Sequence, residues 1–304
     1  GMFVLSMMAM LPVTRPYFVK VCNGFFSKLG ASGVISSVLG GTLHGVGMTI
    51  AASCPVTVFS QVGAMVPNAG YVFLGCLAGT LLYGIFKPAI DAVTKPSVPE
   101  SSNPWIESPY FVMALPLVAM FGILVCAFEI LIPWTSEVKV TTGGDIGVMS
   151  QKAWPPYMSG ILIGSLQLPL IILLGYPLGG SSSFLTMLSV LLVGPLKNVS
   201  SFICGFKTGF KSWWQVWYVC GAMLGAYISA SASGTLHTTQ GVPAVQAFTG
   251  GLIMLLGARI AGGCTSGQGF TGLSFLSIVS LLVIGSSFIA GIVTAHLMKY
   301  TGTL

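Results

Sequence analysis

One apolar segment occurs twice in this chain, and the repetition constrains the fold more than any other feature of the sequence. The first copy runs from Gly41 to Pro55 and the second from Gly251 to Thr265, and they align without a gap at an offset of 210 residues. We therefore expect two structurally equivalent halves; a chance agreement between glycine-rich helices is the alternative. The matched positions are Gly41 with Gly251, Gly47 with Gly257, Ala51 with Ala261 and Cys54 with Cys264.

Each copy predicts an apolar helix that ends at its cysteine, Cys54 or Cys264. Residues that break helices follow at once: Pro55 in the first copy, and Gly267 and Gly269 in the second. Small residues at helical spacing let helices approach closely in lipid. Interrupted apolar segments at corresponding positions of two halves indicate a binding site near the middle of a bilayer.

The composition predicts that the chain lies in a lipid bilayer. Of its 304 residues, 54% are hydrophobic and 6% are charged, whereas soluble domains carry about 25% charged residues. The formal net charge of +6 gives no reason to expect a nucleic-acid partner, because basic residues in short loops set the orientation of membrane proteins. We therefore expect an all-α polytopic membrane protein.

The seven cysteines predict no cofactor, no metal and no disulfide framework. They form no CxxC pair and no cluster with histidine at zinc-like spacing, and their number is odd. Most of them are expected to be small apolar side chains of the core. Cys54 and Cys264 differ from the others only through their place in the repeat.

The apolar runs predict about eight transmembrane helices, with short re-entrant or interfacial helices between them. A membrane helix needs roughly 20 residues, so the runs at 2–11 and 184–193 are too short to cross. Residues 12–32 predict a basic loop with a short interfacial helix. The longer runs are Gly33–Cys54, Tyr71–Phe86, Tyr110–Pro133, Tyr157–Leu178, Trp213–Ala232, Val245–Cys264 and Leu273–Leu297.

The basic residues favour a re-entrant hairpin at Phe184–Val193. With that hairpin, eight basic residues share one side of the membrane and three lie on the other, whereas a crossing gives six against five. An excess of lysine and arginine marks the cytoplasmic side, so we expect the eight-to-three arrangement. The two copies of the repeat then run in opposite directions, which makes them inverted repeats, a common plan among membrane transporters.

The repeat also predicts the domain organisation. We expect an N-terminal half at 1–90, a linker at 91–109 and a C-terminal half at 110–304. Shifted by 210 residues, the run at 2–11 corresponds to 212–221, within the later run Trp213–Ala232. We therefore expect part of the first half to precede the first residue; the alternative is a genuine start that packs against the other helices.

Two polar residues inside the apolar segments need a physical reason. An arginine at the centre of a membrane helix, such as Arg259, costs about 2.5–3.5 kcal/mol on the mildest scale. It either attracts an anion, or it extends to the interface or caps the carbonyls of a neighbouring helix. His44, matched by Met254 in the second copy, is either a hydrogen-bonded core histidine or a ligand or proton carrier.

At these residues the chain resembles the YeeE/YedE sulfur-transport family. The resembling segments are Gly40–Cys54 and the more specific Gly250–Gly267, and the similarity extends over most of the chain from about Ser36 onward. The resemblance implies an α-helical inner-membrane protein with inverted halves that takes up thiosulfate. Carried over to matching positions, it implies a central path lined by Cys54 and Cys264. The neighbours that we expect on this path are Arg259, Gly47, Gly257, Ser266 and His44.

The chemistry of a thiosulfate path agrees with thiols as its lining. Conduction fails if binding is too tight, and a neutral thiol is only a weak donor toward a soft terminal sulfur. No ATP-binding P-loop is present, so we expect a transport step driven by a gradient or by consumption of the substrate. We expect a transporter rather than an enzyme. The alternatives are a membrane thiol oxidoreductase and a sulfur-relay subunit that hands sulfur to a cytoplasmic acceptor protein.

Overall fold

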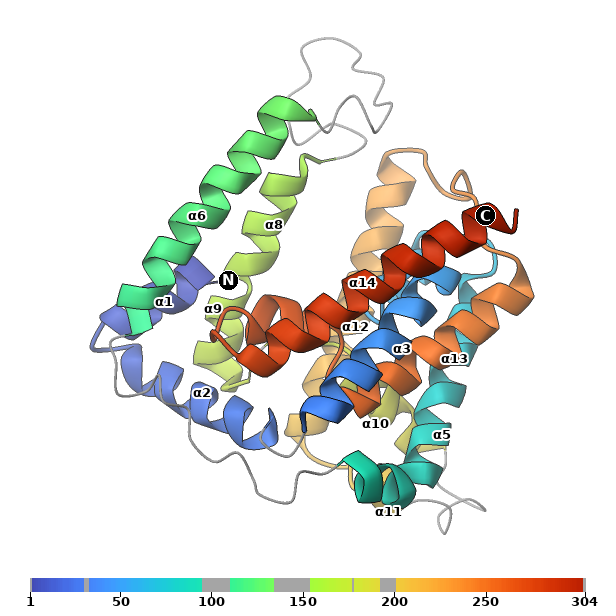
Figure 1. Ribbon diagram of the computed structural model, residues 1–304, viewed down its shortest axis with the longest axis horizontal. Coiled ribbons are helices and arrows are strands. Elements are labelled where there is room, and N and C mark those ends of the chain that lie inside the picture. Colours follow the sequence, from blue (N-terminus) through green and yellow to red (C-terminus); the bar gives the residue numbers. More distant parts are fainter. Residues whose placement is uncertain are drawn as a thin grey trace. The chain divides into compact units, whose positions relative to one another are not determined.

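A computed structural model describes residues 2–29, 33–94, 110–133, 154–176, 178–191 and 201–302, and the regular structure in these ranges is helical throughout (Figure 1). By its internal contacts the chain forms two units. Unit 1 consists of residues 1–26, 102–178 and 274–276, and unit 2 of residues 27–101, 179–273 and 277–304. These units follow contacts rather than the repeat, so the division into halves at 1–90 and 110–304 stays a prediction. The predicted linker lies mostly outside the described residues.

Among the described residues, five helices are long and apolar enough to cross a membrane. Two more helices, α10 (Ser182–Leu191) and α13 (Ala244–Ile260), are apolar but shorter. The expectation of a multi-pass α-helical membrane protein is confirmed at this level. The five candidate spans are Val34–Ala51, Ala69–Ala92, Val112–Leu131, Pro156–Leu174 and Ile278–Tyr300.

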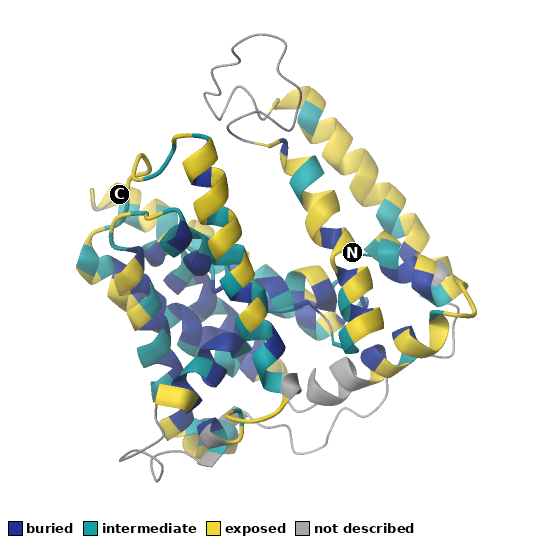
Figure 2. Ribbon diagram, turned by 180° about the vertical axis from the view of Figure 1, so that it is seen from behind, coloured by how far each residue is buried: buried dark blue, intermediate teal, exposed yellow. Residues whose placement is uncertain are grey.

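Unit 1 is built on a small apolar core. In this core the ring of Phe18 lies 4.9 Å from that of Tyr110 and 5.9 Å from that of Phe275, measured between centroids. Most residues of α6 are apolar and exposed (Figure 2). This is the pattern of a helix that faces lipid. The helices are α1 (Met2–Met10), α2 (Arg15–Leu29), α6 (Tyr110–Leu131), α8 (Pro156–Ser165), α9 (Gln167–Pro169) and the π-helix η3 (Leu170–Leu174).

The centre of unit 2 is the crossing of α3 (Val34–Ala51) with α13, which lie side by side in Figure 1. A Cβ atom at Gly47 would lie 2.2 Å from the Met254 nitrogen, and one at Gly257 would lie 2.4 Å from the His44 nitrogen. The two contacts are equivalent under the repeat, because Gly47 corresponds to Gly257 and His44 corresponds to Met254 at the offset of 210 residues. The crossing is therefore reciprocal, and only glycine allows the backbones to come this close.

A second pair of contacts at this crossing obeys the same rule. A Cβ atom at Gly40 would lie 2.3 Å from the Ala261 nitrogen, and one at Gly250 would lie 2.5 Å from the Ala51 nitrogen. As the residue numbers increase along α3, the numbers of their contact partners on α13 decrease. The two helices therefore run antiparallel.

One further helix flanks each side of this crossing. Gly41 of α3 meets Val283 of α14 (Ile278–Tyr300), and Gly251 of α13 meets Val72 of α5 (Ala69–Thr94). Residue numbers increase in the same direction on both helices of such a pair. In α3 and α14, for example, Gly41 meets Val283, and Thr49 donates a hydrogen bond to the carbonyl of Gly291. Each flanking helix thus runs parallel to the one that it covers.

The reciprocal glycines predict a stability effect. Replacing Gly47 or Gly257 by alanine should lower the free energy of unfolding by about 1–3 kcal/mol or more, because the new methyl group meets backbone atoms that cannot rotate away. Gly285→Ala in α14 is the control, because a Cβ atom there meets nothing within 4 Å and alanine favours a helix by up to about 1 kcal/mol. Thermal denaturation of the purified protein in detergent measures all three. Equal melting temperatures in the three variants would contradict the close crossing.

The helices of the repeat end earlier than the sequence predicts. α3 ends at Ala51 and α13 at Ile260, and left-handed residues then reverse the chain: Ala52 with φ 47° and Gly262 with φ 75°. The predicted ends at the cysteines are therefore wrong by three to four residues, and both cysteines lie in the turns. A short helix follows each turn, α4 (Thr57–Gly63) in the first copy and the π-helix η4 (Ser266–Gly272) in the second.

The predicted helix Leu273–Leu297 begins later than expected. η4 extends to Gly272, and α14 starts only at Ile278, where the Ser277 hydroxyl accepts the N–H of Ser280 at 3.2 Å. This cap satisfies one of the free N–H groups of a helix start.

The remaining helices of unit 2 are α10, α11 (Ser201–Cys204) and α12 (Phe210–Ala232). α10 has ten residues, about half the length that a crossing needs. α11 lies beside the end of α5, where the Lys87 ammonium is 4.7 Å from the centroid of the Phe202 ring and 3.0 Å from the Asp91 carboxylate.

Candidate functional site

Cys264 lies at the turn after α13 and is only 1% exposed. Its sulfur is 2.9 Å from the hydroxyl oxygen of Ser266. The backbone N–H of Gly267 and the side chain of Ser181 also hydrogen-bond with this thiol. A buried sulfur is therefore surrounded by small polar groups, several of which are donors.

Cys54 has a related environment at the turn after α3. Its sulfur accepts the backbone N–H of Thr57 at 3.5 Å, and its own N–H donates to the Thr57 hydroxyl at 2.6 Å. Thr57 corresponds to Gly267 in the repeat, so each sulfur faces the N–H group three residues later. The main difference is exposure, since Cys54 is only partly buried.

Two further elements of unit 2 meet these turns. In the loop before α10, a Cβ atom at Gly180 would lie 2.5 Å from a methyl carbon of Val56, and one at Gly179 would lie 3.7 Å from the Cα of Gly267. The loop therefore touches the segments that follow both cysteines. From α12, Tyr218 packs against the buried core cluster that contains Cys264.

Sequence reasoning missed Ser181 and Tyr218. The run of two glycines and three serines at 179–183 marked an interruption, and its small polar side chains were a signal that could have placed Ser181 near a site. No pattern in the sequence distinguishes Tyr218 from the other tyrosines, because its position depends on how α12 packs.

Arg259 lies in the last turn of α13 and interacts electrostatically with Cys264 and Tyr83. Its Nε and Nη2 atoms are buried and have no hydrogen-bond partner among the residues that the structure describes. Within the described ranges the carboxylate found in a salt bridge, Asp91, pairs with Lys87. Neither of these two nitrogens caps a helix carbonyl, and neither reaches water. Arg259 is partly buried as a whole, but burying two guanidinium nitrogens without partners is costly, so a bound anion would improve their environment.

His44 is fully buried and uses both ring nitrogens. Nδ1 lies 2.9 Å from the Met254 carbonyl oxygen, and Nε2 lies 3.3 Å from the Thr265 nitrogen. Because a carbonyl can only accept, Nδ1 carries the proton and Nε2 accepts the N–H of Thr265. The structure thus places His44, like Gly47 and Gly257, inside the helix crossing.

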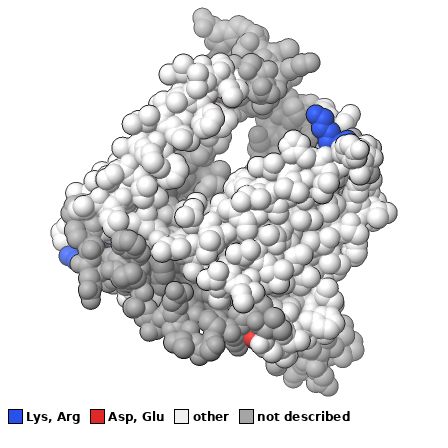
Figure 3. Space-filling model, in the orientation of Figure 1, with Lys and Arg blue, Asp and Glu red and all other residues white. Residues whose placement is uncertain are grey.

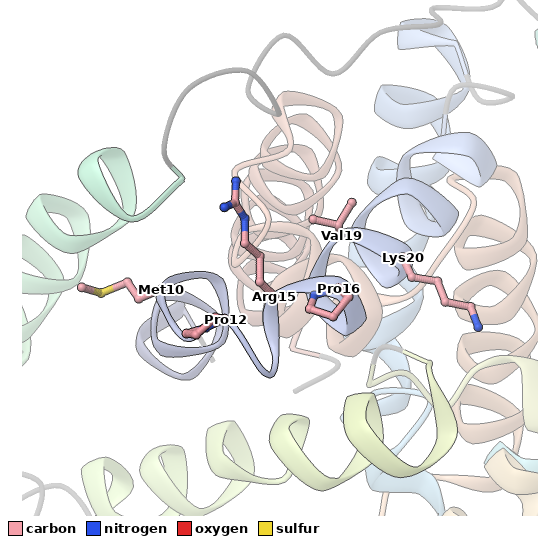
Figure 4. Close-up of a pocket in the computed structure, with 6 residues that line it drawn as sticks. All are labelled: Met10, Pro12, Arg15, Pro16, Val19 and Lys20. Carbon is pink, nitrogen blue, oxygen red and sulfur yellow. The ribbon is translucent and has the colours of Figure 1, made fainter.

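A hollow of about 620 Å³ lies between α1 and α2 in unit 1 (Figure 4). Its two cations, Arg15 and Lys20, point apart rather than toward a common point. The hollow is therefore not a site of converging groups. Its lining residues are Met10, Pro12, Arg15, Pro16, Val19 and Lys20.

Charged side chains are scarce over the described part of the face shown in Figure 3. A group of three or more histidine, cysteine, aspartate or glutamate side chains that could hold a metal ion is not found among the described residues. The cysteines that the structure describes are free thiols. The polar groups around Cys54 and Cys264 are therefore the main candidate site.

Comparison with known proteins and families was made over the whole sequence. None of the curated proteins compared with the chain matches it. A model of the family described as sulphur transport matches residues 2–294, which is nearly the whole chain. The chain therefore belongs to the sulphur transport family, also called the YeeE/YedE family.

Proposed function

We propose that this sulfur transporter takes up thiosulfate along a path in unit 2 that passes Cys54 and Cys264. Membership of the family supports sulfur transport as the activity. The observation that carries the finer proposal is that both thiols lie in equivalent turns, where each sulfur faces the backbone N–H of the residue three positions later.

The groups around Cys264 suit an anion with one soft sulfur and three oxygens. A thiol donates weakly to sulfur, while the Ser266 hydroxyl and the Gly267 N–H can donate to oxygen. Arg259 supplies positive charge nearby, and two of its nitrogens have no partner among the described residues. Such partners hold the anion weakly and repeatedly, as conduction requires. No bond is made or broken in this passage.

The proposal includes about eight transmembrane helices, two inverted repeats and a place in the inner membrane. The antiparallel, reciprocal crossing of α3 and α13 supports the inverted repeats. The contact between Lys87 and Phe202 supports a shared cytoplasmic side for the end of α5 and the α11 segment. A cytoplasmic protein that accepts the sulfur remains a proposal.

Uptake of labelled thiosulfate by purified protein in liposomes tests this function. Uptake should be saturable, and unlabelled thiosulfate should compete at least about tenfold better than sulfate or sulfite, a difference of about 1.4 kcal/mol. Sulfate and sulfite lack the terminal sulfur, so they lose the contact with the thiols. Equal competition by sulfate would contradict the role of the thiols. Transfer of label to a soluble acceptor without uptake would instead support the sulfur-relay alternative.

A further inference from the structure

His44 joins α3 to two positions of the second repeat, 210 and 221 residues away in sequence. It lies on α3, donates to the carbonyl of Met254 on α13, and accepts the N–H of Thr265, the residue after Cys264. The Thr265 hydroxyl also contacts the sulfur of Met48 at 3.8 Å. The segment that carries Cys264 is therefore tied to the middle of α3.

The other half of the repeat cannot make this connection. The position equivalent to His44 is Met254, and the position equivalent to Thr265 is Pro55. Proline has no N–H to donate, and the methionine sulfur is only a weak acceptor. The corresponding bond from α13 to the segment after Cys54 is thus chemically excluded.

The polar contacts described for the Cys54 turn are local. Cys54 bonds with Thr57, and the Gln61 amide donates to the Ala52 carbonyl at 3.0 Å. Cys54 is also partly exposed, whereas Cys264 is 1% exposed. A segment with few bonds to the rest of the fold opens at lower free energy than one tied at its centre.

We infer that His44 is a positioning residue that fixes the Cys264 half of the path, so that the Cys54 half is the part that moves during transport. The two thiols then differ in role: Cys264 provides a fixed contact for the anion, and Cys54 lies where the path opens. The transport part of this inference rests on the proposed function, but the restraint on Cys264 can be measured without transport.

The experiment compares alkylation of individual cysteines in the purified protein by a neutral thiol reagent, read out by mass spectrometry of peptides. In the unchanged protein, Cys54 should react at least about tenfold faster than Cys264. His44→Met copies the other half of the repeat and removes both bonds. It should raise alkylation of Cys264 about tenfold relative to Cys76, which is fully buried in the same core.

Two further variants keep the test independent of how well His44→Met folds. His44→Gln keeps one donor and one acceptor, so its Cys264 should be alkylated at a rate close to that in the unchanged protein rather than at the raised rate of His44→Met. Thr265→Pro copies Pro55 and removes the N–H from the other side of the bond; the Thr265 φ of −54° suits proline. It should therefore expose Cys264 as His44→Met does.

The same variants separate positioning from general stability. Positioning predicts that His44→Met raises the KM for thiosulfate uptake several-fold and that His44→Gln restores it. An equal rise in the alkylation of Cys76 and Cys264 would show general loosening and overturn the inference, as would unchanged Cys264 reactivity in both His44→Met and Thr265→Pro. A lack of thiosulfate uptake by the unchanged protein would contradict the proposed function alone, because the alkylation ratios would still report the restraint.

Discussion

Cys264→Ala should lower thiosulfate uptake per folded molecule by about 10- to 100-fold, the effect of losing one hydrogen bond of about 1.5–3 kcal/mol to a charged group. The thiol lies among Ser266, Ser181 and the Gly267 N–H. Its removal deletes the one soft group of that cluster. Cys264→Ser should keep a donor and so recover part of the uptake, but with weaker preference for thiosulfate over sulfite.

Cys76→Ala is the matched control for this effect. Cys76 is a fully buried thiol of the same core, so its removal tests the cost of lost volume without the polar cluster. Uptake per folded molecule should stay within about twofold in this variant, while stability falls as for other buried truncations. If Cys264→Ala and Cys76→Ala transport equally after normalisation, the Cys264 thiol only packs.

Arg259→Gln should raise the KM for thiosulfate about tenfold, with a smaller change at saturating substrate. A buried cation increases the local concentration of an anion, and this steering acts mainly on encounter. Arg259→Lys should restore part of the affinity, because it keeps the charge but loses the planar fork that can hold an oxyanion through two bonds. Initial rates of uptake across a range of substrate concentrations measure both variants.

A binding measurement distinguishes anion attraction from a structural role for Arg259. Its Nε and Nη2 atoms have no partner in the described part of the chain, so thiosulfate should raise the melting temperature of the unchanged protein, and Arg259→Gln should lose that rise. Lys299→Gln, which removes an exposed charge of α14, should keep it. Loss of abundance and stability in Arg259→Gln, with unchanged uptake per folded molecule, would exclude the anion role.

The sequence predicted the parts of this fold that depend on local pattern. Glycine and alanine at helical spacing predicted the tight contacts now found at Gly47 and Gly257. The breaks after the two apolar segments were also predicted, because proline and glycine act where they stand. The position of Arg259 near Cys264 followed from their distance of five residues on one segment.

The parts that escaped prediction depend on partners from distant segments. His44 is bonded to residues 210 and 221 positions away, so no local pattern distinguishes its role from that of a ligand. The ends of α3 and α13 were wrong because the left-handed residues Ala52 and Gly262 reverse the chain before each cysteine. Ser181 and Tyr218 reach the thiols through the packing of α10 and α12.

The reciprocal crossing of α3 and α13 also limits how the two copies of the segment can diverge. Each close approach occurs twice, with Gly40 against Ala261 and Gly250 against Ala51. A larger residue at one of these positions could be accommodated only by a smaller one opposite, and the partners are already glycine and alanine. Differences between the two segments at the crossing are therefore expected at positions other than these small residues, as with His44 and Met254, and there the two segments can acquire different tasks.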